Sequence, residues 1–222
     1  MNGYFITGTD TGIGKTRAAC ALLAYFSAQG KSVVGMKPVA CGDAGAGGDV
    51  AQLVAASNVA APRAWVNPYA FASPIAPQLA AEAAGARIEP EAIQRAFTKL
   101  QSLAEAVIVE GVGGFCVPLN ARQDTSDMAK LIGLPVILVV GIRLGCLNHA
   151  LLTRQAIDAA GLPLAGWVAN LIDPQMLACE ENIAALEARL ACPRLATLPF
   201  RDAENALENA AEDAKQFCGN FP

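Results

Sequence analysis

Charged residues are scarce in this chain. Of its 222 residues only 16% are Asp, Glu, Lys or Arg, and the formal net charge is −4. No run of lysines and arginines could neutralise successive phosphates, so we expect no nucleic-acid partner. Hydrophobic residues make up 54% of the chain. A surface with so little charge leaves apolar area to cover, which favours a homodimer.

Histidine and paired cysteines are also lacking. His149 is the single histidine, and none of the seven cysteines forms a C-x-x-C pair. Zinc and iron–sulfur sites need such clusters, so neither is expected. Most of the cysteines are expected to be small buried hydrophobes with reduced thiols. His149 lies at the start of an expected helix beside Asn148, which favours packing or an interface over general-base catalysis.

Long apolar runs and long linkers are absent as well. The apolar stretch at residues 134–142 is too short to cross a bilayer. The N-terminus runs directly into a strand pattern and shows no signal peptide. There is no internal repeat and no linker that would divide the chain. We therefore expect a cytoplasmic protein with no membrane partner and one domain spanning residues 1–222.

What the chain does have is a regular alternation of strand and helix patterns. Strands are expected at residues 5–7, 32–36, 106–109, 135–141, 165–170 and 196–199. Helices are expected at residues 16–29, 49–56, 89–104, 126–132, 148–160 and after residue 174, with loops at 41–48, 67–69 and 73–74. The strands are apolar on both faces, as in a parallel sheet covered by helices. The fold class is therefore α/β, a three-layer arrangement with a mostly parallel sheet.

A phosphate-binding loop connects the first expected strand to the first expected helix. Residues 8–16 read G-T-D-T-G-I-G-K-T, one residue longer than the common G-x-x-x-x-G-K-[ST] pattern. Backbone N–H groups of such a loop and the helix N-terminus bind phosphate. Lys15 adds a positive charge near the β- and γ-phosphates, and the Thr16 hydroxyl can bind Mg²⁺. This makes the fold P-loop NTPase-like and predicts a nucleoside triphosphate with Mg²⁺ as ligand.

Polar residues follow several strands where each one ends. Glu110 ends a hydrophobic strand and precedes a glycine-rich turn, which indicates a carboxylate close to a ligand. Lys37 is held in an extended direction by the following Pro38 and is expected to face the same pocket as Lys15. Two cations there suit the charge that develops in phosphoryl transfer. Asp49 begins a helix, and its spacing leaves an N-cap and a metal ligand equally open.

Taken together, these motifs resemble the dethiobiotin synthetase family. The similarity extends from the N-terminus to about Pro199 and follows the family's order, at residues 8–16, 37–39, 109–114, 134–141, 144–149 and 166–170. Residues 201–222 match least well, and Cys41 stands where Ser or Thr is frequent, which leaves a direct substrate contact by its thiol open.

The resemblance implies an ATP-dependent ligase of biotin biosynthesis. Such an enzyme forms a carbamate from 7,8-diaminononanoate and CO₂ or bicarbonate, phosphorylates it with ATP, and closes the ureido ring of dethiobiotin with release of ADP and phosphate. It also implies a homodimer whose substrate site is shared across the interface.

The resemblance further implies a role for particular residues. The catalytic residues would be Lys37, Lys15 and Thr11. The Mg²⁺ ligands would be Thr16, Asp49 and Glu110. The nucleotide would contact Gly12, Ile13, Gly14, Lys15, Thr16, Asp49, Glu110, Gly111, Val112, Gly113, Asn170, Pro199, Phe200 and Arg201. The substrate would contact Thr11, Lys37, Cys41, Gly145, Cys146, Leu147 and Asn148.

Two other classes of protein share the phosphate loop. Switch ATPases of the partitioning or metallocentre-delivery type often carry a second lysine near the start of the loop. This chain has Thr9-Asp10-Thr11 there, which disfavours that class. Amidoligases that modify corrin side chains usually carry a further glutamine-hydrolysing domain, for which this chain has no room.

Overall fold

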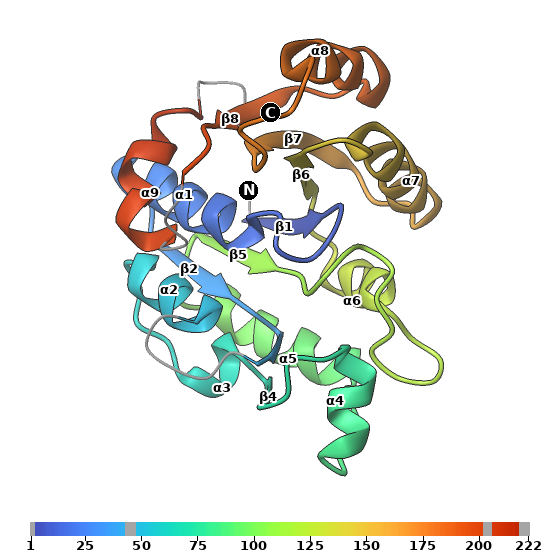
Figure 1. The fold of residues 1–222 in the computed structure, drawn as a ribbon. Helices are drawn as coiled ribbons and strands as arrows, with labels where there is room; N and C mark the ends of the chain where they lie inside the picture. The colour runs from blue at the N-terminus through green and yellow to red at the C-terminus, as the bar shows by residue number, and fades with distance from the viewer. Residues whose placement is uncertain (1–2, 43–47, 202–205, 218–222) are drawn as a thin grey trace.

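The computed structural model describes residues 3–42, 48–201 and 206–217 (Figure 1). Most of the expected loop at residues 41–48, together with Cys218, lies outside these ranges. No helix within them is long and apolar enough to span a membrane.

A parallel sheet of six strands forms the centre of the molecule. Its strand order is β2-β5-β1-β6-β7-β8, and every pairing between these neighbours is parallel. The strands are β1 (Gly3–Gly8), β2 (Val33–Met36), β5 (Ala106–Glu110), β6 (Val136–Ile142), β7 (Leu164–Leu171) and β8 (Arg194–Leu198). The predicted fold class, a three-layer α/β fold with a parallel sheet, is confirmed.

Helices cover both faces of this sheet, because alternate residues of each strand point to opposite faces (Figure 1). In β1, Tyr4 and Ile6 pack into one core cluster, whereas Phe5 packs into another. The first face is covered by α1 (Lys15–Ala28), α2 (Asp49–Ala56) and α9 (Ala206–Ala214). The second face is covered by α5 (Pro90–Gln101), α6 (Thr125–Ile132), α7 (Cys146–Ala159) and α8 (Cys179–Leu190).

A second, two-stranded sheet was not expected from the sequence, and two of its residues, Cys41 and Tyr69, lie in expected loops. Strand β3 (Val39–Cys41) pairs in parallel with β4 (Tyr69–Phe71). Two short helices flank β4, namely α3 (Arg63–Val66) and α4 (Pro77–Ala83). The loop expected at residues 67–69 is therefore wrong at Tyr69. Three-residue strands are too short to show a periodic pattern, which is why the sequence does not reveal them.

The cysteines are more exposed than expected. Of the six described cysteines, Cys20 and Cys146 are buried, whereas Cys41, Cys116, Cys179 and Cys192 are half-buried or exposed. The expectation that most of them are buried is therefore wrong for the described part of the chain. The half-buried and exposed ones lie at strand ends, helix ends and turns, where packing is incomplete.

Polar residues collect at one edge of the main sheet. Because all its strands are parallel, their carboxyl ends lie along the same edge, where ligands of α/β proteins bind. The phosphate loop follows β1, Lys37 follows β2, Glu110 ends β5, and Asn170 lies near the end of β7.

Candidate functional site

A cavity of about 730 Å³ opens at this edge. It brings together residues that are far apart in the sequence but follow neighbouring strands. The residues of the sequence-based prediction that line it are Thr11, Gly12, Gly14, Lys15, Thr16, Lys37, Cys41, Asp49, Glu110, Val112, Gly113, Asn170, Phe200 and Arg201. A cavity of this size suits a nucleotide together with a small substrate.

The loop after β1 presents a helix N-terminus to the cavity. Helix α1 begins at Lys15, and its N-cap, Gly14, has a φ of 90° and provides no side-chain cap. The first N–H groups of the helix therefore remain for an anion. Gly14 also allows the loop to lie close to Asn170, because a Cβ atom at this position would be only 2.2 Å from Nδ2 of Asn170. Any larger residue would combine an unfavourable φ with this clash.

Lys15 bends back over the loop. Its Nζ donates a hydrogen bond of 2.7 Å to the carbonyl oxygen of Asp10. The Asp10 carboxylate is in turn 2.6 Å from Nη2 of Arg143, which follows β6. Burial, together with the nearby charge of Lys37, lowers the pKa of Lys15 to about 8. An anion bound in the loop would favour the charged form of this lysine.

Lys37 lies at the floor of the cavity between two carboxylates. Its Nζ is 2.5 Å from Oε1 of Glu110 and 2.9 Å from Oδ2 of Asp49. The Lys37 side chain is 5% exposed and that of Glu110 is 1% exposed, so this pair is shielded from water. Pro38 fixes the backbone direction of Lys37, and both Lys15 and Lys37 line the same cavity, as the sequence predicts.

Asp49 is the first residue of α2 and not its N-cap. The N-cap is Gly48, which makes no side-chain cap. The N-cap interpretation of Asp49 is therefore wrong. Its carboxylate accepts hydrogen bonds from Lys37 and from the Thr16 hydroxyl instead.

The carboxylates have opposite pKa shifts because they are buried to different extents. Burial raises the pKa of Glu110, and the charge of Lys37 only partly offsets this effect. Burial would also raise the pKa of Asp49, but Lys37 outweighs it and the pKa falls below its usual value. For Lys37, burial would lower the pKa, whereas Glu110 and Asp49 together raise it, so this lysine stays charged.

The group around Thr16 has the donor set of a divalent cation site. Oγ1 of Thr16 is 2.9 Å from Oδ1 of Asp49 and 2.9 Å from Oε1 of Glu110. A hydroxyl has one hydrogen and can serve only one of these oxygens at a time. In addition, Oε2 of Glu110 is buried and has no hydrogen-bond partner among the described residues. This surplus of hard oxygen acceptors fits Mg²⁺, which binds one or two carboxylates together with phosphate oxygens and water.

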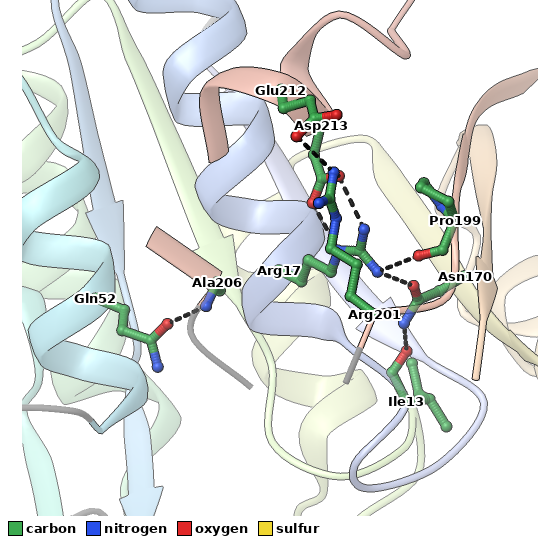
Figure 2. A network of polar contacts seen from close by, with 9 residues as sticks. All are labelled: Ile13, Arg17, Gln52, Asn170, Pro199, Arg201, Ala206, Glu212 and Asp213. Carbon is green, nitrogen blue, oxygen red and sulfur yellow. Dashed lines mark hydrogen bonds and ion pairs between the residues drawn. The ribbon is translucent and has the colours of Figure 1, made fainter. Parts of the chain in front are cut away.

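The far end of the cavity is formed by Asn170 and the segment after β8 (Figure 2). Nδ2 of Asn170 donates to the carbonyl oxygen of Ile13, at 2.8 Å. Oδ1 accepts from Arg17, which also donates to the carbonyl oxygen of Pro199. These contacts join the phosphate loop to the end of β7 and to the segment that contains Phe200 and Arg201.

Several predicted residues do not line the cavity. The side chain of Ile13 is buried, and the backbone carbonyl oxygen of Ile13 accepts a hydrogen bond from Asn170. Gly111 and Pro199 are not among the lining residues, although each is next to one in the sequence. The four residues expected to bind the distal end of the substrate, Gly145, Cys146, Leu147 and Asn148, lie at the start of α7 and do not reach the cavity of their own chain.

The cavity wall also contains residues that were not predicted. Arg17 and Gln52 line it from α1 and α2, and Ala206 and Asn209 line it from α9. Arg17 directly follows Thr16, but an arginine in the first turn of a helix usually faces water. Nothing local indicates its long-range partners.

Fold and site together define the class of protein. A parallel α/β sheet, a phosphate loop with Lys15-Thr16 and carboxylates opposite Thr16 are the parts of a P-loop NTPase.

A family model described as an AAA domain matches residues 2–206. The septum site-determining protein MinD in complex with Mg-ADP from Pyrococcus horikoshii is 16% identical, with a TM-score of 0.61 over 97% of this chain and 93% of that one. A ParA family ATPase from Chlorobium tepidum is 15% identical, with a TM-score of 0.56 over 97% and 90%. At such identities the likeness shows the fold alone.

Sequence comparison gives the family within this class. The ATP-dependent dethiobiotin synthetase BioD of Nitrosospira multiformis is 57% identical over 89% of this chain and 88% of its own length. The protein of the same name from Aromatoleum aromaticum is 53% identical over 88% and 89%. The chain belongs to the dethiobiotin synthetase family and is an ATP-dependent ligase of biotin biosynthesis. The predicted family and enzyme class are confirmed.

Proposed function

We propose that this chain closes the ureido ring of dethiobiotin from 7,8-diaminononanoate, CO₂ and ATP. One amine attacks CO₂ and loses a proton, which gives a carbamate. A carbamate oxygen then attacks the γ-phosphorus of ATP, and ADP leaves. The second amine attacks the carbonyl carbon, phosphate leaves with its bonding electrons, and loss of a proton completes the ring. The main observation that supports this proposal is the position of Lys37 beside the phosphate loop.

Lys37 provides what a carbamate needs to react. A carbamate is a poor electrophile, so an oxygen must become a leaving group before the ring can close. The buried Nζ of Lys37 is a fixed positive charge at the cavity floor, and Lys15 lies beside it. Charge that develops on the carbamate and the transferred phosphoryl group would be stabilised by these two cations. Thr11 and Cys41 line the same cavity and would lie on the substrate side.

The nucleotide would lie between the loop and the far wall of the cavity. Residues of the loop, Gly12, Gly14, Lys15 and Thr16, would hold the phosphates, and Asn170, Phe200 and Arg201 would face the base. Gly111, Val112 and Gly113 follow β5 and would approach both ligands. Mg²⁺ would be held by Thr16, Asp49 and Glu110, and when bound it would neutralise phosphate charge.

Phosphate release should depend on the diamine substrate. With Mg-ATP, bicarbonate and 7,8-diaminononanoate, we expect the purified protein to release one phosphate for each dethiobiotin formed. Without the diamine, phosphate release should fall to the background rate, because no carbamate is available to attack ATP. Coupled phosphate detection and mass spectrometry of the product measure both quantities. Phosphate release that ignores the diamine would contradict the ligase and favour a switch ATPase.

The second part of the proposal is a homodimer with a shared substrate site. Leu144 is 91% exposed and Leu152 is 56% exposed. Asn148 and Leu152 are four residues apart in α7 and so share one face of that helix, and Leu144 lies just before the helix begins. Exposed leucines on both sides of Asn148 suit contact with a second copy of the chain. The N-terminus of α7 would then hold the distal carboxylate of the substrate in the partner's cavity.

Mixed subunits test the shared site. Lys37→Ala and Asn148→Ala are each expected to reduce ring closure strongly on their own. Coexpressed, they should regain up to about a quarter of the natural activity, because half the dimers are mixed and each has one intact site. Purification through two different tags and assay of each species measures this. If the mixed dimers stay as inactive as either parent, each cavity uses residues of one chain only.

A further inference from the structure

Arg17 makes an unusual set of contacts for a residue beside the phosphate loop (Figure 2). Its Nε is 2.6 Å from Oδ2 of Asp213, and its Nη2 is 2.8 Å from Oδ1 of the same residue. Its Nη1 lies 3.1 Å from Oδ1 of Asn170 and 2.8 Å from the carbonyl oxygen of Pro199. All three guanidinium nitrogens are therefore engaged by protein, and Arg17 joins three segments of the chain.

The contact with Asp213 fixes α9 against α1. The Arg17 side chain is 13% exposed and the Asp213 side chain is completely buried. The two parallel N–H···O bonds match the planar guanidinium to the carboxylate, an arrangement that a lysine cannot reproduce. Helix α9 is therefore held in one position on the helix that carries the phosphate loop.

The contact with Asn170 fixes the orientation of its side-chain amide. The carbonyl oxygen of Ile13 requires a donor, and Nη1 of Arg17 requires an acceptor. Only one orientation of the amide satisfies both. Arg17 therefore determines how Asn170 lies against the phosphate loop.

Helix α9, together with Phe200 and Arg201, forms one wall of the cavity. Ala206 and Asn209 line the cavity from α9. The backbone N–H of Ala206 donates to Oε1 of Gln52 at 2.7 Å, which joins this wall to α2. Nη2 of Arg201 is 2.9 Å from Glu212 and 3.6 Å from Asp213. Arg201 of this wall and Arg17 therefore both contact the carboxylate of Asp213.

We propose that Arg17 is a positioning residue that holds the base-side wall of the nucleotide site. It acts through Asp213, Asn170 and the carbonyl oxygen of Pro199, and it aligns this wall with the phosphate loop. The ligand affected is the base and ribose of a nucleoside triphosphate, not its phosphates. This inference rests on the proposed placement of the nucleotide between the loop and the far wall.

Two ligands separate this role from a general loss of structure. ATP needs the loop and the wall, whereas inorganic tripolyphosphate needs only the loop. In Arg17→Met/Asp213→Leu, apolar side chains replace the buried pair, so neither of its charges is left alone, and Arg201 keeps Glu212 as its partner. Helix α9 can then remain in place. We expect ATP affinity, measured by calorimetry, to fall about 10- to 100-fold, the usual effect of removing a group that orients a binding residue. Affinity for tripolyphosphate should stay within about twofold, because the loop itself is unchanged.

Further variants keep the test decisive. Arg17→Lys keeps the charge but cannot reach Asp213, Asn170 and Pro199 together, so it should show the same selective loss, at least about threefold. If the double variant does not fold, Arg17→Lys alone tests the role of Arg17. Arg194→Met is the matched control: it removes the ion pair of Arg194 with Glu187, outside the cavity, and should change neither affinity.

The outcomes distinguish this inference from the proposed function. Equal losses for ATP and tripolyphosphate, or no loss for ATP, would overturn the role of Arg17. If the unsubstituted protein does not bind ATP, both the proposed function and the role of Arg17 are overturned. If the Arg17 variants lose affinity for ATP but not for tripolyphosphate, and the unsubstituted protein does not close the ring, the role of Arg17 stands and the proposed reaction is wrong.

Discussion

Replacing Lys37 with alanine should lower the rate of dethiobiotin formation at saturating ATP by roughly 10²- to 10³-fold, the usual cost of removing one group that stabilises developing charge. Affinity for ATP should stay within about threefold, because the phosphates are held by the loop and the N-terminus of α1. Single-turnover formation of dethiobiotin and calorimetric titration with ATP measure the two effects separately.

The same substitution should lower stability in a way that depends on Mg²⁺. Without Lys37, the carboxylate of Glu110 stays buried without its 2.5 Å partner. A buried carboxylate that has lost its cationic partner is strongly destabilising. The melting temperature of Lys37→Ala should therefore fall in the absence of metal and recover partly when Mg²⁺ is added. Lys130→Ala, which removes an exposed ion pair with Asp127, is the control and should change neither rate nor melting temperature. A loss of ATP affinity comparable to the loss of rate would place Lys37 on the nucleotide and not on the carbamate.

The parts of the site that could be predicted have strong local patterns. A glycine-rich loop between an apolar strand and a helix is compatible with few structures, so Lys15 and Thr16 follow from their neighbours alone. The direction of Lys37 can be predicted because Pro38 restricts the backbone of the residue before it. Glu110 follows from its place at the end of a β-branched strand. Parallel strands then place these residues at one edge without any knowledge of their contacts.

The parts that could not be predicted depend on long-range contacts. Arg17 and Asp213 are 196 positions apart in the chain, and neither belongs to a pattern that would identify the other. Strands β3 and β4 are too short for a periodicity to appear. Asp49 could have been an N-cap or a metal ligand, and only the position of Gly48 before the helix decides against the cap.

The start of α7 is a different case. Gly145 and Asn148 do not reach the cavity of their own chain. In the proposed homodimer they would belong to the partner's cavity, and one chain would contain only half of the substrate site. The sequence can therefore suggest these residues, but their distance from the substrate would depend on a second copy.

Replacing Glu110 with glutamine should raise the Mg²⁺ concentration for half-maximal turnover by at least about tenfold and lower kcat by roughly 10²- to 10³-fold. The amide has nearly the same shape as the carboxylate. Its oxygen, placed at Oε1, would still accept from Lys37 and Thr16. Its NH₂ group would then replace Oε2, the buried oxygen without a hydrogen-bond partner, and would point hydrogens to the place where a cation binds. Lys37 keeps the carboxylate of Asp49 as a charged partner, so the melting temperature without metal should fall less than in Lys37→Ala. Its increase on addition of Mg²⁺ should become smaller.

Glu105 provides the matched control, because it lies next to the opposite end of the same strand, β5, and accepts hydrogen bonds from Ser32 at the surface. Glu105→Gln should leave the Mg²⁺ requirement unchanged. Steady-state rates over a Mg²⁺ titration at fixed ATP measure both variants. If Glu110→Gln keeps the natural Mg²⁺ requirement, Glu110 does not bind the metal, and its buried carboxylate serves only to hold Lys37. If the requirement rises but kcat at saturating Mg²⁺ is fully restored, Glu110 recruits the metal without taking part in the phosphoryl transfer. A loss of both would assign it the double role that its position between Lys37 and Thr16 indicates.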